Sequence, residues 1–221
     1  NKINIYGNSR TDEKVIRREL TFAEGDTFTS DQINKSKNNL NRLNLFKSIN
    51  IESINLNNEF SNIDIYIEEK STGDFKIGLS FDTFGGATFI TGLNEKNIAG
   101  VGRNLDLTIN TANDNTTDAI GVLEPHSFNS EFDLIYSLDY AEKDYSASSS
   151  YNLDSLKLES GLRYDLSDKV IHNILFNYKL NKYTVTNKEN VSSIISKSEG
   201  SNASISLNNI LIYDNLNSFM I

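Results

Sequence analysis

Cysteine, tryptophan and long apolar runs are absent from this chain of 221 residues, and proline occurs once. Without cysteine, the chain can hold no disulfide scaffold, no cysteine-ligated zinc and no cysteine nucleophile. No stretch approaches the ~18 apolar residues that a transmembrane helix needs, which excludes a helical membrane protein. The two histidines, His126 and His172, fall in no recognisable Ser-His-Asp pattern. We therefore expect no enzyme active site.

The formal net charge is −9, and it is unevenly distributed along the chain. Residues 1–70 have a net charge of −1, whereas residues 71–221 have a net charge of −8. The acidic excess argues against a general nucleic-acid-binding protein. The change near residue 70 predicts a domain boundary there. Because no signal peptide precedes Asn1 and Ile221 ends a strand-like run, we expect an excerpt from a longer protein.

The first seventy residues predict a small α+β domain with the element order β-α-α-β-β. Alternating apolar residues indicate three strands, at residues 2–6, 47–56 and 61–68. Acids in a first helical turn, preceded by the hydroxyl of Thr11 as N-cap, predict a helix over residues 12–20.

A second helix is predicted to begin at Ser30 and Asp31. Its apolar stripe consists of Ile33, Leu40 and Leu43. Asn44 is expected to end this helix in left-handed backbone. Both helices should then cover the same face of the sheet.

Residues 71–221 predict an antiparallel all-β domain. In the clearest strand, apolar side chains alternate with charged ones over residues 156–166. Several strands approach the ~9–11 residues of a tilted membrane-spanning strand. Charges avoid the apolar faces of the best strands, where Lys or Arg would cost ~2–4 kcal/mol at the bilayer midplane. The predicted strands are residues 74–82, 86–96, 103–112, 117–124, 131–141, 154–166, 170–181 and 203–214.

A soluble sandwich or barrel is the alternative, because one buried sheet face gives the same alternation. Three features favour the membrane: strand length, aromatic residues near strand ends, and short turns that alternate with long polar connections. The connection at 167–169 is tight, for example, whereas residues 182–202 form a long polar one.

Several motifs along the chain resemble a known family. The segments Ile5–Thr11, Val15–Glu19, Glu24–Asp26 and Leu40–Phe46 resemble a POTRA module, specifically the barrel-proximal POTRA of BamA-type outer-membrane assembly factors. One departure is Asn44, where the family usually has Gly. Asn tolerates positive φ, so the turn should be kept.

The barrel-like part carries the same resemblance. Ser71–Phe75 is similar to the start of the family's first barrel strand, and Glu95–Arg103 to a later turn with a spaced glycine pair. Glu124–Phe128 resembles the next turn more weakly, because His126 and Ser127 depart from the pattern. Family barrels have about twice eight strands, so the resemblance implies one POTRA followed by the open N-terminal half of a larger barrel.

The resemblance also implies location and partners. The barrel would lie in the bacterial outer membrane, with the POTRA domain in the periplasm. Its partners would be unfolded outer-membrane proteins, assembly-complex lipoproteins and outer-membrane lipid, without nucleic acid or a cofactor. No metal site is expected, because the loop with Asp114, Asn115 and Asp118 lacks the glycine and terminal glutamate of an EF-hand.

Two surfaces are candidate functional sites. The first is the POTRA strand at 47–56, which includes Ile49, Ile51 and Ile54 and is exposed at a sheet edge in such modules. An exposed edge can accept an added strand through main-chain hydrogen bonds, although Lys47 and polar side chains could instead protect it.

The second surface is the first barrel strand, which in the resembled family forms the lateral seam and pairs with client strands. Its residues are Phe75, Ile77, Gly78, Leu79 and Phe81, and the alternative is a plain structural strand. Gly78 is expected to weaken local packing. A third, weaker candidate is Glu24 with Asp26, in the region that the resemblance places opposite an assembly lipoprotein.

The sequence therefore favours an assembly factor that folds and inserts β-barrel proteins into the outer membrane. Three alternatives stay open: a POTRA-bearing two-partner secretion pore, the barrel anchor of a fused lipase, and a soluble binding module.

Overall fold

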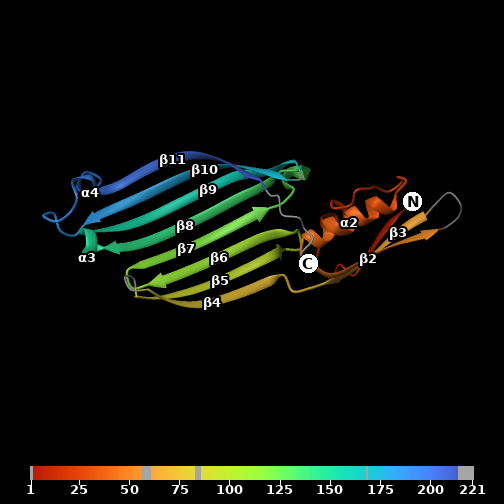
Figure 1. The fold of residues 1–221 in the computed structure, drawn as a ribbon, viewed down its shortest axis with the longest axis horizontal. Helices are drawn as coiled ribbons and strands as arrows, with labels where there is room; N and C mark the ends of the chain where they lie inside the picture. Colours follow the sequence, from red (N-terminus) through yellow and green to blue (C-terminus); the bar gives the residue numbers. More distant parts are fainter. Residues whose placement is uncertain (1, 56–60, 83–85, 168, 214–221) are drawn as a thin grey trace. The chain divides into compact units, whose positions relative to one another are not determined.

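A computed structural model describes residues 2–55, 61–82, 86–167 and 169–213 of the chain. It divides into two compact units, Asn1–Gly73 with Glu95–Asn104, and Asp74–Asn94 with Leu105–Ile221. The secondary structure of both units is shown in Figure 1.

The first unit has the predicted order β-α-α-β-β. Its elements are β1 (Ile3–Tyr6), α1 (Glu13–Arg17), α2 (Ser30–Arg42), β2 (Phe46–Asn55) and β3 (Ser61–Glu69). The three strands form one sheet in the order β1-β3-β2. β3 is central, pairing in parallel with β1 and antiparallel with β2.

Both helices begin at capping residues, but the first cap differs from the prediction. Asp12, not Thr11, caps α1, its side chain accepting a hydrogen bond from the amide of Lys14. Thr11 is unavailable because its hydroxyl and amide bind other partners, described below. The helix also ends at Arg17, earlier than predicted.

The second helix is close to its prediction. Thr29 and Gln32 form a capping box at the start of α2. Asn44, just beyond this helix, has a φ of 58°, which confirms the predicted left-handed stop.

The core of the first unit lies between the sheet and the two helices. Leu40 of α2 and Ile16 of α1 are fully buried there, and so is Ile65 of β3. The apolar side chains of this core are those of Ile3, Val15, Ile16, Phe22, Leu40, Leu45, Phe46, Ile49, Ile63, Ile65 and Ile67.

The second unit is an eight-stranded sheet in which each strand neighbours the next along the chain, in the order β11-β10-β9-β8-β7-β6-β5-β4 (Figure 1). The pairs from β7 to β11 are antiparallel. All eight strands match predicted ones. They are β4 (Gly73–Asp82), β5 (Gly86–Ile98), β6 (Arg103–Ala112), β7 (Asn115–Glu124), β8 (Asp133–Tyr145), β9 (Tyr151–Ser167), β10 (Val170–Val185) and β11 (Gly200–Tyr213).

Several strands extend further than predicted into polar segments. β8 and β9 pair as far as Tyr145 opposite Tyr151, where the sequence indicated a loop. The backbone ladder continues there because hydrogen bonding does not require the apolar alternation that the prediction followed. Two one-turn helices follow strands, α3 (Ser146–Ser149) and α4 (Ser193–Lys197), and a 3₁₀ turn lies at Ser127–Asn129. In the described part of the chain, no helix has the length and apolar character to cross a membrane.

Strand register separates the two faces of this sheet. One row across five strands is apolar, consisting of Ile120, Leu138, Leu158, Tyr178 and Ile205. The neighbouring row on the other face is mostly polar, consisting of Ala119, Asp139, Lys157, Lys179 and Ser204. Lys157 there contacts Asp139 at 3.7 Å and Glu159 at 3.0 Å. An apolar face without a protein layer and a polar face with ion pairs are typical of a membrane barrel wall.

Candidate functional site

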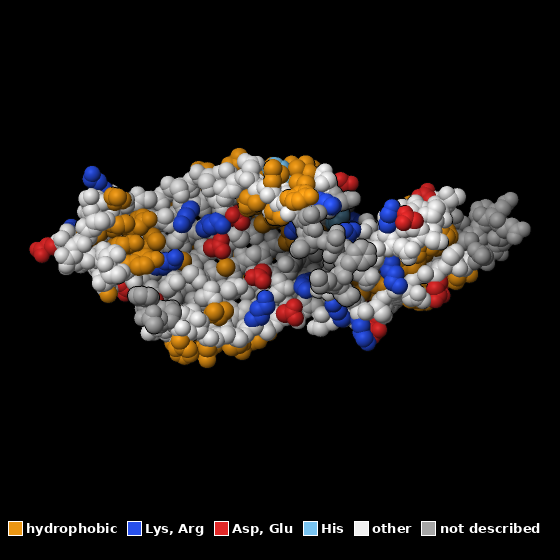
Figure 2. Space-filling view, in the orientation of Figure 1, with side chains coloured by type: hydrophobic (Ala, Val, Ile, Leu, Met, Phe, Trp, Pro, Cys, Tyr) orange, Lys and Arg blue, Asp and Glu red, His pale blue; other side chains and the backbone are white. Residues whose placement is uncertain are grey.

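β4 forms one end of the eight-stranded sheet among the described residues. Its four large apolar side chains, Phe75, Ile77, Leu79 and Phe81, alternate along the strand and are each at least 66% exposed. Leu158, on an interior strand, is 46% exposed. The greater exposure of β4 follows from its position, because one of its long sides has no described neighbour. Figure 2 shows hydrophobic side chains gathered along the edge of the sheet where Figure 1 draws β4.

Gly78 lies in the middle of this strand. A Cβ added there would meet the Cβ of Ile90 at 3.6 Å, an ordinary van der Waals contact. Sterics therefore do not require glycine at this position. Its expected role in weakening the packing of the strand stays a prediction.

β2 lies at one edge of the sheet in the first unit. Of its three candidate residues, Ile49 belongs to the core and Ile51 packs against it, while Ile54 is exposed on the other face. The side chains of Ile49 and Ile51 are thus engaged within the domain. What β2 presents to an added strand is mainly its backbone.

The start of β2 is bound to its neighbour by an ion pair. Lys47 Nζ lies 2.6 Å from Glu68 Oε1, and Ser48 Oγ donates to the other oxygen of the same carboxylate. The hydrogen bond with Glu68 raises the pKa of Lys47, and the hydrogen bonds from Lys47 and Ser48 lower the pKa of Glu68. This end of the edge is therefore more protected than the end near Ile54.

Glu24 and Asp26 both stabilise their own domain. Glu24 Oε1 accepts from the amide of Ile3 at 3.2 Å and lies 3.3 Å from Arg17 Nη1. The hydrogen bond from Ile3, together with the charge of Arg17, lowers the pKa of Glu24. Asp26 Oδ2 accepts from the amide of Ala23 at 2.9 Å. Both side chains hold the segment after α1 in place, and contact with a partner stays a prediction.

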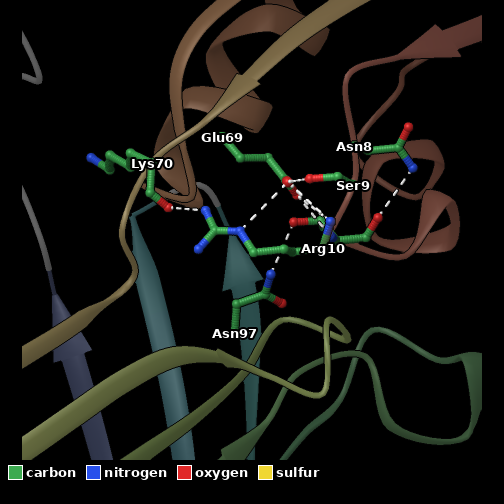
Figure 3. Close-up of polar contacts among 7 residues, drawn as sticks. Asn8, Ser9, Arg10, Glu69, Lys70 and Asn97 are labelled. Carbon is green, nitrogen blue, oxygen red and sulfur yellow. Dashed lines mark hydrogen bonds and ion pairs between the residues drawn. The ribbon is translucent and has the colours of Figure 1, made fainter.

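Sequence reasoning missed a polar network centred on Glu69 (Figure 3). The Glu69 side chain is only 6% exposed. Its carboxylate accepts hydrogen bonds from Ser9 Oγ at 2.9 Å and from the amide of Thr11 at 2.7 Å. The amide of Arg10 also donates to it, and Arg10 Nε lies 3.6 Å away. Burial raises the pKa of Glu69, but the hydrogen bonds from Thr11, Ser9 and Arg10 outweigh burial and lower it to about 2.

The same network includes the turn between β5 and β6, which belongs to the first compact unit. Asn97 Nδ2 donates to Thr11 Oγ1 at 2.9 Å, and Asn97 Oδ1 accepts from the amide of Gly102. The amide of Asp12 donates to the carbonyl of Gly100 at 2.8 Å. Gly100 has a φ of +77°, and a Cβ there would lie 2.2 Å from the carbonyl oxygen of Arg10. Only glycine fits this turn as it is built.

No metal site is formed by the described residues, among which no group of three potential ligands occurs. His172 lies in β10, where its Nδ1 is 2.7 Å from the hydroxyl oxygen of Tyr164 and its ring packs edge-on against that tyrosine. These contacts are those of an ordinary packed residue.

A three-stranded α+β domain followed by an antiparallel sheet with a lipid-compatible face defines a class of outer-membrane proteins. Family models support this assignment: the POTRA model, described as a surface antigen variable number repeat, matches residues 1–70, and the Omp85 superfamily domain matches residues 97–221. The chain belongs to the Omp85 superfamily. Its fold is a POTRA domain followed by a fragment of a BamA-like barrel, and it lies in the bacterial outer membrane with the POTRA domain in the periplasm.

Proteins with similar sequences belong to the family that the sequence motifs resemble. The chain is 24% identical over 171 residues to the outer membrane protein assembly factor BamA of Neorickettsia risticii, an alignment of 76% of this chain and 23% of that protein. It is 31% identical over 111 residues to BamA of Buchnera aphidicola, covering 49% of this chain and 18% of that protein. The resemblance to BamA-type assembly factors is confirmed, and the chain spans about a quarter or less of these relatives.

Solved structures agree on the fold. A crystal structure of BamA from Haemophilus ducreyi lacking POTRA domains 1–3 has a TM-score of 0.75 at 20% identity, and covers 99% of this chain and 44% of that one. CdiB from Acinetobacter baumannii has a TM-score of 0.58 at 15% identity, and covers 96% of this chain and 39% of that one. The fold is thus nearer to BamA than to CdiB.

Proposed function

We propose that the chain is the POTRA-and-barrel portion of an assembly factor that folds and inserts β-barrel proteins into the outer membrane. The edge of β4, which has a strand neighbour on only one side among the described residues, is the observation that carries the proposal. This edge belongs to the strand that ends a wall whose apolar side chains face lipid. The relatives named as outer membrane protein assembly factors support the same role.

The physical basis is the cost of unpaired backbone in lipid. An N–H or C=O group without a partner in the hydrocarbon region costs several kcal/mol, on the order of the energy of an isolated hydrogen bond. Along the side of β4 that has no neighbour among the described residues, backbone N–H and C=O groups would offer a client strand hydrogen-bond partners before it meets lipid. Strand addition of this kind needs neither a catalytic group nor a cofactor.

In the periplasm, the backbone of β2 would receive an extended client segment before the barrel does. Because Lys47 is paired with Glu68, pairing would begin near Ile54 rather than at the start of the strand. Glu24 and Asp26 are the proposed contacts for an assembly lipoprotein.

Disulfide crosslinking in the full-length protein tests the role of β4. Ile77→Cys, in the middle of β4, should crosslink to a cysteine in the terminal strand of a client stalled during insertion. Leu158→Cys is the matched control, because it has a similar apolar side chain on an interior strand whose two edges are already paired. It should give no crosslink.

Equal crosslinking at both positions would mean that the client only collides with the lipid-facing wall. If no position along 74–82 crosslinks, β4 is not the pairing edge. A secretion pore, the main alternative, would show an exported partner in the polar interior of the barrel. Crosslinks from Lys157→Cys, with none from Ile77→Cys, would therefore favour that alternative.

A further inference from the structure

Among the described residues, the POTRA sheet has one face that no helix of its own unit covers. Isoleucines on all three strands point to the core on the helix side. The alternate residues therefore lie on the opposite, open face. They are Asn4 and Tyr6 of β1, Asn50 and Glu52 of β2, and Asp64 and Tyr66 of β3.

Two tyrosines form a stacked pair on this open face. The rings of Tyr6 and Tyr66 are 5.2 Å apart with an interplanar angle of 18°. Both residues stay exposed, at 46% and 42%. On its other side, Tyr66 has Asn50 as its cross-strand neighbour. The Asn50 amide donates to Glu52 Oε1 at 2.6 Å, along its own strand.

Two carboxylates lie beside the tyrosine pair without a cation from the described residues. Asp64 is 6% exposed and accepts hydrogen bonds from Asn4 Nδ2 at 2.8 Å and from the Tyr66 hydroxyl at 3.4 Å. Glu52 is the cross-strand neighbour of Asp64. Neither carboxylate forms an ion pair with a described residue. For Asp64 this is unusual, because buried carboxylates are seldom left without a positive partner.

We infer that this open face, formed by Tyr6, Tyr66, Asp64 and Glu52, is a docking surface for an arginine side chain presented by an extended protein segment. A guanidinium is planar and stacks on aromatic rings, while its N–H groups bind carboxylates in pairs. A lysine offers the charge without the plane, and a neutral planar side chain offers the plane without the charge. The combination of a ring pair with two carboxylates that have no ion-pair partner among the described residues therefore selects arginine.

Ligand-observed saturation-transfer NMR on the full-length protein in lipid nanodiscs tests the inference. The probe is a short Gly/Ser/Thr peptide with one central arginine, compared with the same peptide carrying lysine or citrulline. Citrulline has the shape of arginine without its charge. Binding should be strongest for arginine, weaker for lysine and absent for citrulline, and Glu52→Gln should weaken arginine binding about threefold to tenfold.

Asp31→Asn is the matched control, because it removes one negative charge from an exposed position on α2, on the helix side of the sheet. It should leave arginine binding unchanged. If Asp31→Asn weakens binding as much as Glu52→Gln does, the peptide senses only the overall acidic charge and the inference fails. Equal binding of citrulline and arginine overturns it as well.

Tyr6→Leu is a second variant, which removes one ring and keeps both carboxylates. It should reduce the preference for arginine over lysine. An unchanged preference would exclude stacking. These outcomes are independent of crosslinking at Ile77, so the docking surface and the assembly role can fail separately.

Discussion

Isoleucines on strands of the two units differ in burial. Ile65 on β3 is fully buried beneath two helices, whereas Ile205 on β11 is 68% exposed. Both lie in strands where apolar and polar side chains alternate. The difference teaches that alternation shows which face of a strand is apolar. It does not show whether that face packs against protein or lies against lipid, which depends on what covers the sheet.

The polar side chains differ in a corresponding way. In the POTRA unit, carboxylates such as Glu69 bind backbone amides and fix loops. In the eight-stranded sheet, Asp139 and Glu159 contact Lys157 across the face opposite the apolar row. The first unit is held by a core and a network, and the second by its strand ladder.

The largest effect is expected from the core of the POTRA unit. Leu40→Ala removes a fully buried side chain of α2, and should destabilise this unit by about 2–5 kcal/mol. Hydrogen exchange of the α2 amides in the full-length protein measures this loss of stability. Lys37→Ala, at an exposed position of the same helix, should change stability by less than about 0.5 kcal/mol. Similar losses in both variants would contradict a core centred on Leu40.

The next effect separates the two faces of the barrel sheet. Leu138→Arg places a charge in the apolar row of β8 and should cost about 2–4 kcal/mol in the bilayer. Ser137→Arg, one residue earlier, places it on the polar face opposite Glu159 and should be tolerated. The fraction of protein that resists extraction from membranes by urea measures the difference. Equal insertion of both variants would show that the apolar row does not face lipid.

The strands could be predicted from the sequence because a two-residue period runs through the clearest of them. Asn44 could be predicted because its effect is local. The role of Thr11 could not, since its partners are Glu69 and Asn97, 58 and 86 residues away along the chain. The residues of the Glu69 network form no local pattern in the sequence. The only sequence signal was Gly100, where glycine is required because the carbonyl oxygen of Arg10, distant in the chain, lies too close for a Cβ.

The third prediction concerns pH. The pKa of Glu69 is lowered from 4.5 to about 2 in the folded protein. Its contribution to stability is therefore complete above about pH 5 and is lost as the pH falls toward 2. The loss should be at most about 3 kcal/mol. Glu69→Gln should be less stable at neutral pH and should lose less stability across this window. A wild-type protein whose POTRA unit is equally stable at pH 6 and pH 3 would contradict the network.

The smallest effect tests whether the β5–β6 turn is part of the POTRA unit. Gly100→Ala combines positive φ with a clash against the carbonyl oxygen of Arg10, and should cost about 1–3 kcal/mol. Gly25→Ala is the matched control in the same unit, because Gly25 has a φ of +93° but nothing within 4 Å of an added Cβ. It should cost about 1 kcal/mol. Faster hydrogen exchange at Thr11 and Asp12 in Gly100→Ala, and not in Gly25→Ala, would assign the extra cost to the contact with Arg10. Equal exchange in both variants would leave backbone strain as the whole effect and would separate this turn from the unit that contains Glu69.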